Sequence, residues 1–435
     1  MASEWQKCTL GDIVKIKHGY AFKGEYFATT PTKTILVTPG NFAIGGGFQI
    51  KSLKYYQGPV PVDYVLHPGQ LVVTMTDLSK ESDTLGYSAL VPDDGITWLH
   101  NQRIGLVTIK EPSMADIRFI NYVLRTREYR SWVVGSASGT TVKHTSPDRI
   151  SAFSFLLPPV KEQEAIACIL GALDDKIELN RQMCKTLEDT AQAIFKSWFV
   201  DFDPVHAKAA GKQPQGMNPE IATLFTDSFE ESEFGQIPKG WSISRLGDHF
   251  NLTMGQSPPG NTYNEDRDGE PFYQGRYDFG FRFPKKRVYC SGPTRFANKG
   301  DTLVSVRAPV GDINMASERC AIGRGVASVR HIGGSSSFTY YAMKQLRNNF
   351  VSFEAEGSVF GSITKGDFLK LPVIAPPDAL IESFDRLFAV LDNSIKCYEL
   401  QSITLSTIRD SLLPKLISGE LRISDAERIV ERSVR

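Results

Sequence analysis

The sequence predicts an α+β fold: two tandem globular modules of mixed, loop-rich α+β structure, separated by two long helices that pack as an antiparallel coiled coil, with pseudo-two-fold internal symmetry. Three observations support this prediction. An apolar heptad pattern runs through residues 161–200. The same pattern returns 218 residues later, and the globular stretches before the two patterns also repeat.

The first long helix is predicted from an apolar seam whose members are alternately four and three residues apart. The seam consists of Ile166, Leu170, Leu173, Ile177, Asn180, Cys184, Leu187, Ala191, Ile194 and Trp198. Asn180 is its one polar member. A helix of this length spans roughly 60 Å, and it is too long to bury its apolar stripe alone.

The second long helix repeats this seam in the same heptad phase. The repeated seam consists of Phe384, Phe388, Leu391, Ile395, Tyr398, Ser402, Leu405, Arg409, Leu412 and Leu416. We therefore expect the two helices to pack on each other in antiparallel directions. The alternative is two separate core helices.

Each half of the chain has the pattern of a module, a Pro-Pro stop and a long helix. Trp5 and Trp241 are each followed five residues later by Leu-Gly-Asp, at an offset of 236. Pro158-Pro159 and Pro376-Pro377 close the two modules at an offset of 218. The predicted segments are a first module (1–157), a first long helix (158–203), a connector (204–236), a second module (237–375), a second long helix (376–418) and a tail (419–435).

Inside the modules, short β-branched runs bounded by Gly, Pro or Asp predict strands. These runs are 71–75, 104–109, 302–306 and 325–329. One helix is predicted in each module, at 115–134 and at 338–353. The stretch 207–241 is rich in Gly, Pro, Gln and acidic residues, which predicts a surface connector.

The composition, 41% hydrophobic and 23% charged, is that of an ordinary globular chain. No apolar run has the length of a membrane span, and the N-terminal residues lack the apolar core of a signal peptide, so we expect a cytoplasmic protein with no membrane partner. The six cysteines are scattered without a C-x-x-C pair, and the seven histidines stand apart. This predicts reduced thiols and no metal site.

The charge distribution favours nucleic-acid contact more than the net charge does. The formal net charge is zero. Residues 1–150 carry 16 basic and 13 acidic side chains, and residues 241–371 carry 17 and 12. Positive charge in the modules and not in the helices suits two modules that contact phosphates.

Motifs for independent catalysis are missing from the sequence. It has no phosphate-binding loop of the ATP-motor type. Ser257-Pro258-Pro259-Gly260 approaches the motif of an amino-methyltransferase but lacks its aromatic residue, and we interpret it as a turn. Gly45-Gly46-Gly47 is interpreted as a hairpin tip and not as a cofactor cradle, because no helix pattern follows it. We expect no enzyme acting alone and no cofactor bound by this chain.

The stretch 273–287 has five positive charges and one negative charge, interleaved with aromatic residues. Arg bridges guanine and Gln bridges adenine through paired hydrogen bonds, whereas Lys serves phosphates. The alternative is a solvated strand face beside an aromatic core. The comparable stretches of the first module are 15–23 and 76–83.

Positions that differ between the modules are the candidates for base readout, because modules that read different sequences must differ there. These candidates are Thr76, Asp77, Ser79, Lys80, Gln274, Arg276 and Arg307. The candidates for phosphate contact are Lys15, Lys17, Lys23, Arg103, Arg282, Lys285, Lys286, Arg287 and Arg324. Arg103 and Arg324 align at an offset of 221, so this arginine is predicted to be shared, with a purely structural role as the alternative.

Six motifs, in this order along the chain, resemble the DNA-specificity (S) subunits of type I restriction-modification systems. They are LPPVKEQEAIACILGALDDKIELN (157–180), FKSWFVDFDPV (195–205), GW with LGD (240–248), LVSVRAPVGDINMA with CAIGRG (303–325), GSITKGDFLKLPVIAPP (361–377) and LLPKLISGEL (412–421). Together with the duplication, they cover nearly the whole chain. The sequence departs from the family pattern at its start, which lacks the Ile-Pro-Lys-Gly found before Trp241, and at Arg409, which we expect at a partner contact or a frayed turn.

The resemblance implies two target-recognition domains, each of which reads half of a split site in double-stranded DNA. It implies two methyltransferase (modification) subunits docked on the helices, with S-adenosylmethionine bound in them. It also implies restriction subunits with nuclease and motor, which use ATP and Mg²⁺. Two alternatives remain, namely the specificity subunit of a related restriction enzyme whose cleavage and methylation share one partner chain, and a coiled-coil scaffold that binds no DNA.

Overall fold

The computed structural model describes residues 5–79, 81–355 and 361–434. Its contacts divide the chain into two units. Unit 1 combines the residues up to Glu178 with those from Ile403 onward, and unit 2 is Leu179–Ser402. Both boundaries fall inside long helices, so each unit holds one module together with a part of each helix.

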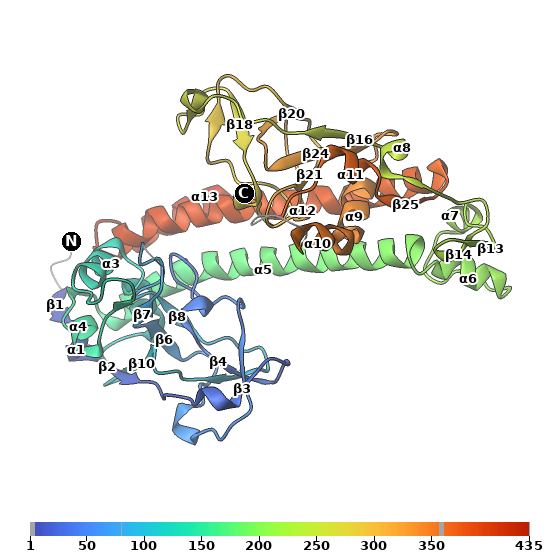
Figure 1. Ribbon diagram of the computed structural model, residues 1–435. Helices are drawn as coiled ribbons and strands as arrows, with labels where there is room; N and C mark the ends of the chain where they lie inside the picture. The colour runs from blue at the N-terminus through green and yellow to red at the C-terminus, as the bar shows by residue number, and fades with distance from the viewer. Residues whose placement is uncertain (1–4, 80, 356–360, 435) are drawn as a thin grey trace. The chain divides into compact units, whose positions relative to one another are not determined.

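The module of unit 1 has two four-stranded sheets, two two-stranded sheets and several short helices (Figure 1). Its main sheet has the strand order β2, β10, β6, β8 and is antiparallel throughout. The second sheet has the order β3, β5, β4, β9, and its β4–β9 pair is parallel. The strands are β1 (Gln6–Thr9), β2 (Val14–His18), β3 (Phe27–Ala28), β4 (Thr34–Leu36), β5 (Lys54–Tyr56), β6 (Leu71–Thr74), β7 (Thr76–Asp77), β8 (Ser88–Leu90), β9 (Thr97–Leu99), β10 (Ile104–Ile109), β11 (Lys143–His144) and β12 (Ser154–Leu157). The helices are α1 (Leu10–Ile13), α2 (Ile117–Val123), α3 (Arg127–Gly135) and α4 (Pro147–Ser151), with 3-10 turns at Gly24–Tyr26, Pro39–Asn41 and Val62–Tyr64.

The main sheet of unit 1 is buried on both faces. Along β6 the side chains alternate, as strand geometry requires. Leu71 and Val73 pack in one cluster with Phe119 of α2, whereas Val72 packs with Trp98 of the second sheet. The order of layers is therefore helices, main sheet, second sheet.

The module of unit 2 repeats this architecture, with one more strand in its second sheet. Its main sheet has the order β16, β24, β21, β22, and its second sheet has the order β17, β19, β18, β23, β20 with a parallel β18–β23 pair. The strands are β15 (Ser242–Arg245), β16 (Phe250–Met254), β17 (Tyr263–Asn264), β18 (Glu270–Tyr273), β19 (Tyr289–Cys290), β20 (Phe296–Ala297), β21 (Thr302–Ser305), β22 (Ile313–Met315), β23 (Cys320–Ile322), β24 (Val326–His331) and β25 (Pro372–Ala375). The helices are α8 (Leu246–His249), α9 (Ser336–Gln345), α10 (Arg347–Ala355) and α11 (Lys365–Leu369), with 3-10 turns at Gly260–Thr262 and Arg276–Asp278. The predicted duplication is thus present in the fold, and so are the four predicted strands.

The first and last strands of each module pair with each other. β1 pairs with β12 and β15 pairs with β25, in both cases antiparallel.

Each module has one glycine near its start at an equivalent position. A Cβ at Gly19 would lie 2.0 Å from the carbonyl oxygen of Asn101, and one at Gly255 would lie 2.2 Å from that of Gly323. Each module therefore requires glycine at the same close approach of two backbones.

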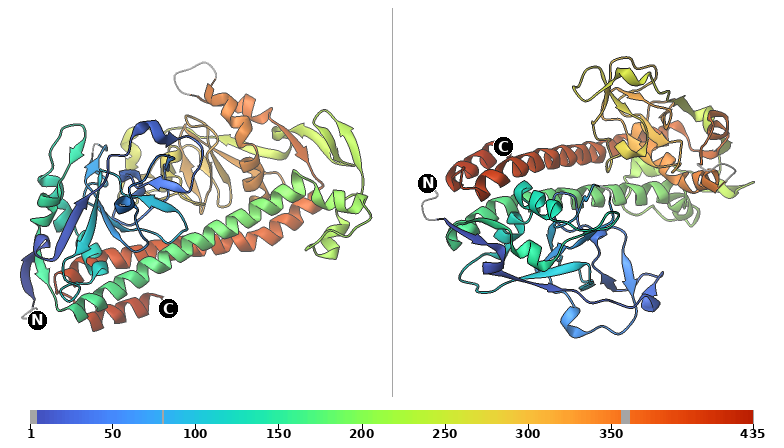
Figure 2. Two further views of the ribbon diagram at one scale, coloured as in Figure 1. Left: turned by 90° about the horizontal axis from the view of Figure 1, so that it is seen from below. Right: turned by 60° about the vertical axis from the view of Figure 1, so that its left-hand side comes forward.

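The predicted long helices are α5 (Val160–Phe199) and α12 (Asp378–Ile417), which lie side by side (Figure 2). In unit 1 the first half of α5 packs with the last half of α12, since Leu170 and Leu173 share a cluster with Leu412. In unit 2 the last half of α5 packs with the first half of α12, since Ala191 shares a cluster with Phe384. The helices are therefore antiparallel in each unit, as predicted.

The seam residues are buried or half-buried in both units. The fully or nearly fully buried apolar members are Ile166, Leu170, Leu173, Cys184, Ala191, Trp198, Phe384, Phe388, Ile395, Leu405, Leu412 and Leu416. The half-buried apolar members are Ile177, Leu187, Ile194, Leu391 and Tyr398. Asn180, the polar member, donates to Gln401 Oε1 at 2.9 Å and to Ser402 Oγ at 3.3 Å across the helix pair.

Two sequence predictions were wrong in detail. The helices predicted at 115–134 and 338–353 are each divided in two, α2 and α3 in unit 1 and α9 and α10 in unit 2. Thr126 ends the first interruption, because its side chain accepts from the Tyr129 backbone N–H and so begins a new helix.

The predicted surface connector is also more ordered than its composition indicates. It forms α6 (Asp203–Ala209), α7 (Pro219–Thr223) and the hairpin of β13 (Phe229–Ser232) and β14 (Gly235–Pro238). Phe202, Phe225 and Ile237 are buried in or beside it. Burial of these side chains fixes the segment on unit 2. A final helix, α13 (Ile423–Val434), belongs to unit 1.

No helix among the described residues is both long enough and apolar enough to cross a membrane.

Candidate nucleic-acid interface

The structure overturns the assignment of Arg282 to phosphate contact. Its side chain is 0% exposed. The guanidinium is paired with Glu188 of α5 and Asp392 of α12, donates to the Tyr341 hydroxyl at 2.7 Å, and lies over the Tyr340 ring. A side chain enclosed in this way binds the module to the helices of unit 2 and does not reach a nucleic acid.

The carboxylate of Glu188 is ionised in this setting. Burial raises the pKa of Glu188, but the Arg282 guanidinium and the Lys344 ammonium outweigh that effect, so the net pKa lies below its ordinary value. Lys344 also forms an ion pair with Glu188. Buried charges of this kind are tolerated because each one is paired.

Arg409 of α12 pairs across the helices in unit 1 and is not in a frayed turn, contrary to the prediction. Its Nη1 lies 2.6 Å from Asp174 Oδ1 on α5. The other carboxylate oxygen of Asp174 accepts from Arg125 at 2.6 Å and from the Tyr122 hydroxyl at 2.9 Å. Burial raises the pKa of Asp174, but the two guanidinium groups lower it by a larger amount. The net pKa therefore lies below its ordinary value. The Arg409 guanidinium is therefore engaged within this chain and does not serve a partner contact.

Thr76 and Asp77, predicted to read bases, are buried. Asp77 accepts from the backbone N–H groups of Ser79, at 2.6 Å, and Thr84, at 2.5 Å. Its pKa is lowered because these bonds and one from the Thr84 hydroxyl outweigh the effect of burial. The Thr76 hydroxyl lies 3.2 Å from His144 Nδ1. Asp77 therefore holds the loop together, and the assignment of both residues to base readout is wrong.

Ser79 has a part in the same loop, and Lys80 lies outside the described residues. The Ser79 hydroxyl accepts from the Asp83 backbone N–H at 2.7 Å. Leu78 is exposed at the loop surface.

The shared arginine proposed from the alignment is displaced by one residue. In unit 1, the Met75 N–H donates to the Arg103 carbonyl oxygen at 2.9 Å. In unit 2, the Val306 N–H donates to the Gly325 carbonyl oxygen at 3.0 Å. Because β6 and β21 are equivalent strands, Arg103 corresponds to Gly325, and the residue that corresponds to Arg324 is Gln102. The offset is 222, so the prediction of a shared arginine was wrong.

Three of the predicted residues in unit 2 meet around Gly325. A Cβ at Gly325 would lie 2.3 Å from the Gln274 carbonyl oxygen. Arg324 precedes this glycine, and Arg307 follows Val306, which is bonded to it. The side chains of Gln274, Arg307 and Arg324 are all exposed. Two guanidinium groups and one amide thus lie on three neighbouring segments at one end of the module.

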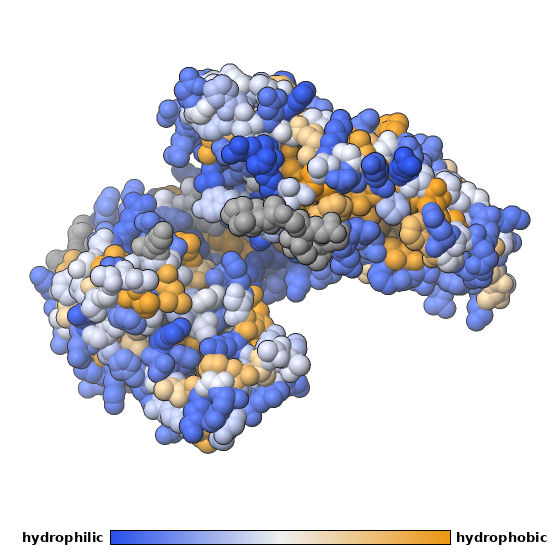
Figure 3. Space-filling model, in the orientation of Figure 1, coloured by the Kyte–Doolittle hydropathy of each residue, from blue (hydrophilic) through white to orange (hydrophobic). Residues whose placement is uncertain are grey.

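The other basic residues of unit 2 are exposed, and most have an acidic partner. Arg276 lies 3.0 Å from Asp312, Arg287 lies 2.8 Å from Asp278, and Lys286 is paired with Glu318. Lys285 is exposed and has no ion-pair partner among the described residues. The surface over β18 and β20 is largely hydrophilic (Figure 3), as expected where these side chains lie.

The basic residues of unit 1 lie along β2 and the segment after it. Lys15 is exposed. Lys17 donates to the Asp63 carbonyl oxygen at 2.9 Å and lies over the Tyr64 ring, and Lys23 lies 3.7 Å from Glu25. Arg103 is exposed in the turn before β10. These side chains are available to a polyanion but are not brought together at one point.

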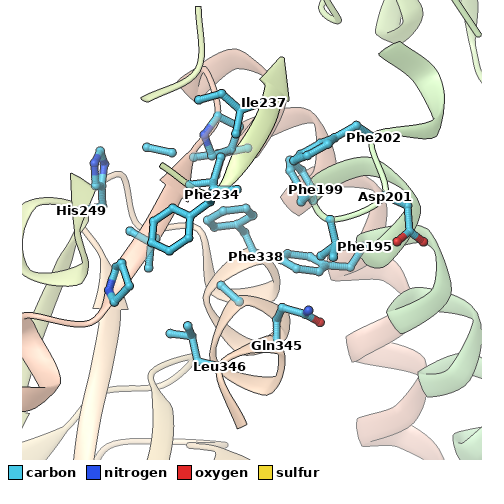
Figure 4. A pocket seen from close by; sticks show the side chains of 18 of the residues that line it. Phe195, Phe199, Asp201, Phe202, Phe234, Ile237, His249, Phe338, Gln345 and Leu346 are labelled. Carbon is cyan, nitrogen blue, oxygen red and sulfur yellow. The ribbon is translucent and has the colours of Figure 1, made fainter. Parts of the chain in front are cut away.

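A cavity of about 470 Å³ in unit 2 lies apart from these residues. It is lined mainly by apolar side chains, among them Phe195, Phe199, Phe234 and Phe338 (Figure 4). His249 lies at its edge and is bonded to Ser244 Oγ at 2.6 Å. The described residues contain no group of three or more His, Cys, Asp or Glu side chains that could hold a metal ion.

The fold and the candidate residues together define a class of protein. Two copies of one scaffold carry unlike exposed side chains at equivalent turns, and paired helices join the copies. This is the construction of a recognition protein with two reading modules.

Comparisons with known proteins identify the family. The model of the "Type I restriction modification DNA specificity domain" matches residues 2–189 and 238–381. The chain is 28% identical over 271 residues to the "Putative type I restriction enzyme MjaX specificity subunit" of Methanocaldococcus jannaschii, a match that covers 61% of this chain and 59% of that protein. It is 27% identical over 352 residues to the type I restriction enzyme HindI specificity subunit of Haemophilus influenzae, covering 68% and 75%.

A solved structure has the same fold. The S subunit of a type I restriction-modification system from M. genitalium matches with a TM-score of 0.57 and 16% identity, over 95% of this chain and 96% of that one. The chain belongs to the type I restriction-modification DNA specificity family and carries two matches to its domain. The resemblance stated from the sequence is confirmed. In this family the specificity subunit is the non-catalytic member of its complex.

Proposed function

We propose that this chain reads a split site in double-stranded DNA for a type I restriction-modification complex, each module reading one half. The observation that carries the proposal is the duplication with divergence. Equivalent turns of the two modules carry Gln102 in one and Arg324 in the other, on backbones with the same hydrogen bonds. Two identical readers would need no such difference, whereas two readers of unlike half-sites require it.

The helices are proposed as the docking site for two methyltransferase subunits. Large apolar side chains are exposed on α5 and α12, among them Leu179, Met183, Leu387 and Val390. Exposed apolar groups of this kind on a helix surface are typical of a protein interface. S-adenosylmethionine belongs to these partners in the proposal. ATP and Mg²⁺ belong to restriction subunits with nuclease and motor, and this chain binds no cofactor. The proposed complex is cytoplasmic.

The deciding experiment is co-expression of the chain with a type I methyltransferase subunit from the same organism, followed by a genome-wide map of methylated adenines. The proposal expects methylation at one sequence consisting of two short defined halves and an undefined gap. Methylation without a common sequence, or at a single continuous sequence, would contradict it. The identity of the chains that co-purify separates this proposal from a related enzyme with a single fused partner. Salt-dependent DNA binding by the purified complex separates it from a scaffold that binds no DNA.

A further inference from the structure

The turn that precedes the central strand of each main sheet is the same backbone structure in both modules. In unit 1 the Ile104 N–H donates to the Asn101 carbonyl oxygen at 2.9 Å. In unit 2 the Val326 N–H donates to the Gly323 carbonyl oxygen, also at 2.9 Å. The two middle residues of each turn are therefore equivalent in pairs, Gln102 with Arg324 and Arg103 with Gly325.

The neighbouring segment fixes this pairing independently. The Tyr20 N–H donates to the His100 carbonyl oxygen at 2.8 Å, and the Gln256 N–H donates to the Ile322 carbonyl oxygen at 3.0 Å. The offset between His100 and Ile322 is again 222. Both turns are thus anchored on two sides, so the first middle residue starts from the same point of the scaffold in each module.

The side chains at this point are exposed and differ in chemistry. Gln102 and Arg324 are both exposed, and the structure gives neither side chain a hydrogen bond or ion pair to another described residue. A residue that only anchors a phosphate has no need to differ between the modules, because phosphates are the same in every sequence. The change from an amide in one module to a guanidinium in the other is therefore better explained by readout of different bases.

The two side chains do fit base readout. Glutamine makes a bidentate pair with the N6 and N7 edge of adenine, and arginine makes one with the O6 and N7 edge of guanine. Arg324 is also flanked by the exposed Gln274 and Arg307, through the contacts at Gly325 and Val306.

We propose that Gln102 and Arg324 are equivalent specificity-determining residues, each of which contacts one base of the half-site read by its module, with adenine matched to Gln102 and guanine to Arg324. This inference rests on the proposed function, because it names residues of the proposed DNA-reading surface. It transfers Arg324 from phosphate contact to base readout and adds Gln102.

The test uses the full chain in complex with its methyltransferase, as wild type, Gln102→Arg and Arg324→Gln. Binding is measured against duplexes that carry every single-base change in both half-sites. We expect Gln102→Arg to change the preferred base at one position of the first half-site from adenine to guanine. Arg324→Gln should make the reverse change at one position of the second half-site. Each change in preference should be about ten-fold to a hundred-fold.

The matched control is Arg103→Gln, the next residue of the same turn. It should leave the base preferred at the position matched to Gln102 unchanged, because the Arg103 side chain starts from a different point of the turn. A selective wild-type complex whose base preference is unchanged in both Gln102→Arg and Arg324→Gln would overturn the inference and leave the proposed function standing. A wild-type complex without sequence selectivity would instead overturn the proposed function. Thermal unfolding of each variant separates lost folding from altered readout.

Discussion

Arg307 stands on the extension of β21, and its counterpart on the extension of β6 is Thr76. Both backbones pair with the segment that returns after the module helices, Arg307 with Ser362 and Thr76 with His144. The threonine is buried by that partner, but the arginine is exposed. At this position, therefore, only the second module presents a side chain for contact.

We expect Arg307→Ala to reduce discrimination in the second half-site by about 1–3 kcal/mol and to leave the first half-site unchanged, since one bidentate base contact is lost. Arg276→Ala should act in the same direction, although Asp312 competes for its guanidinium at 3.0 Å. The measurement is a binding series over single-base variants at two salt concentrations with the methyltransferase present. Equal weakening of every variant would assign both arginines to phosphate contact or structure.

Lys285→Ala is the matched comparison for these arginines. The lysine is exposed in the same hydrophilic segment, and an ammonium on a phosphate carries no sequence information. We expect weaker binding to all sequences and a salt slope flatter by about 1. Loss of discrimination at a single base pair would show that Lys285 reads a base.

The sequence could not show which basic residues reach the surface. Arg282 lies in the most basic stretch of the chain, yet its counterions are 94 and 110 residues away in sequence. The alignment of the two modules also lacked a register, because the offset falls from 236 to 218 within each module. A one-residue error in that offset paired Arg103 with Arg324, and it took the backbone hydrogen bonds to correct it.

At the scale of elements, ion networks fasten each module to the helix pair. Arg282 comes from the loop before β19 and lies between α5 and α12. Lys344 and Tyr341 of α9 contact the Glu188 carboxylate, which also pairs with Arg282. In unit 1, Arg125, just after α2, pairs with Asp174 and so links the module to the helices. The heptad pattern predicted both helices and their seams because apolar spacing is a local signal. The networks were missed because each depends on residues from several distant segments.

We expect Arg282→Met to lower the free energy of unfolding by about 3–5 kcal/mol, since it leaves the buried Glu188 and Asp392 carboxylates without their counterion. Lys286→Met is the control, because its exposed pair with Glu318 contributes about 0–1 kcal/mol. Urea-induced unfolding followed by circular dichroism measures both. Similar midpoints for the two variants would show that the Arg282 network contributes little to stability.

The same networks make the fold sensitive to acid. Glu188 and Asp174 both have a folded-state pKa below the ordinary values of 4.5 and 3.8. A depressed carboxylate pKa stabilises the folded state above the ordinary value, and this stabilisation is lost as the pH falls through the folded-state pKa. We therefore expect stability to fall as the pH is lowered below about 4.5. Glu188→Gln should be less stable at pH 7 and should lose less on acidification, and equal losses in wild type and variant would contradict the assignment.

At the scale of the whole molecule, the helices are proposed to set the gap between the half-sites. Insertions near Phe202, just after the end of α5, would disturb a buried core, because Phe202 packs on Trp241 and Phe229. The unit boundaries after Glu178 and Ser402 are better places. Seven residues inserted at both boundaries preserve the heptad phase of both helices.

We expect this double insertion to lengthen the undefined gap by about three base pairs and to leave both half-sites unchanged. Seven helical residues add about 10 Å, and base pairs are about 3.4 Å apart. Methylation mapping of the variant measures the gap. The control is the same insertion in α5 alone, which should reduce stability because it shifts one seam against the other. An unchanged gap in a stable double variant would remove the helices from this role.

The ion networks also bear on how the two halves of the gene relate to each other. Asp174 and Asp392 are repeat-related, but their partners on the opposite helix are not, because Arg409 corresponds to Ala191 and Glu188 corresponds to Ser406. Two copies of the first half paired through α5 would leave Asp174 facing an alanine, and two copies of the second half would give Arg282 a serine in place of Glu188. In each half, therefore, one of the two partners of a buried or half-buried charge comes from the other half. We expect separately expressed halves to assemble with each other in preference to themselves.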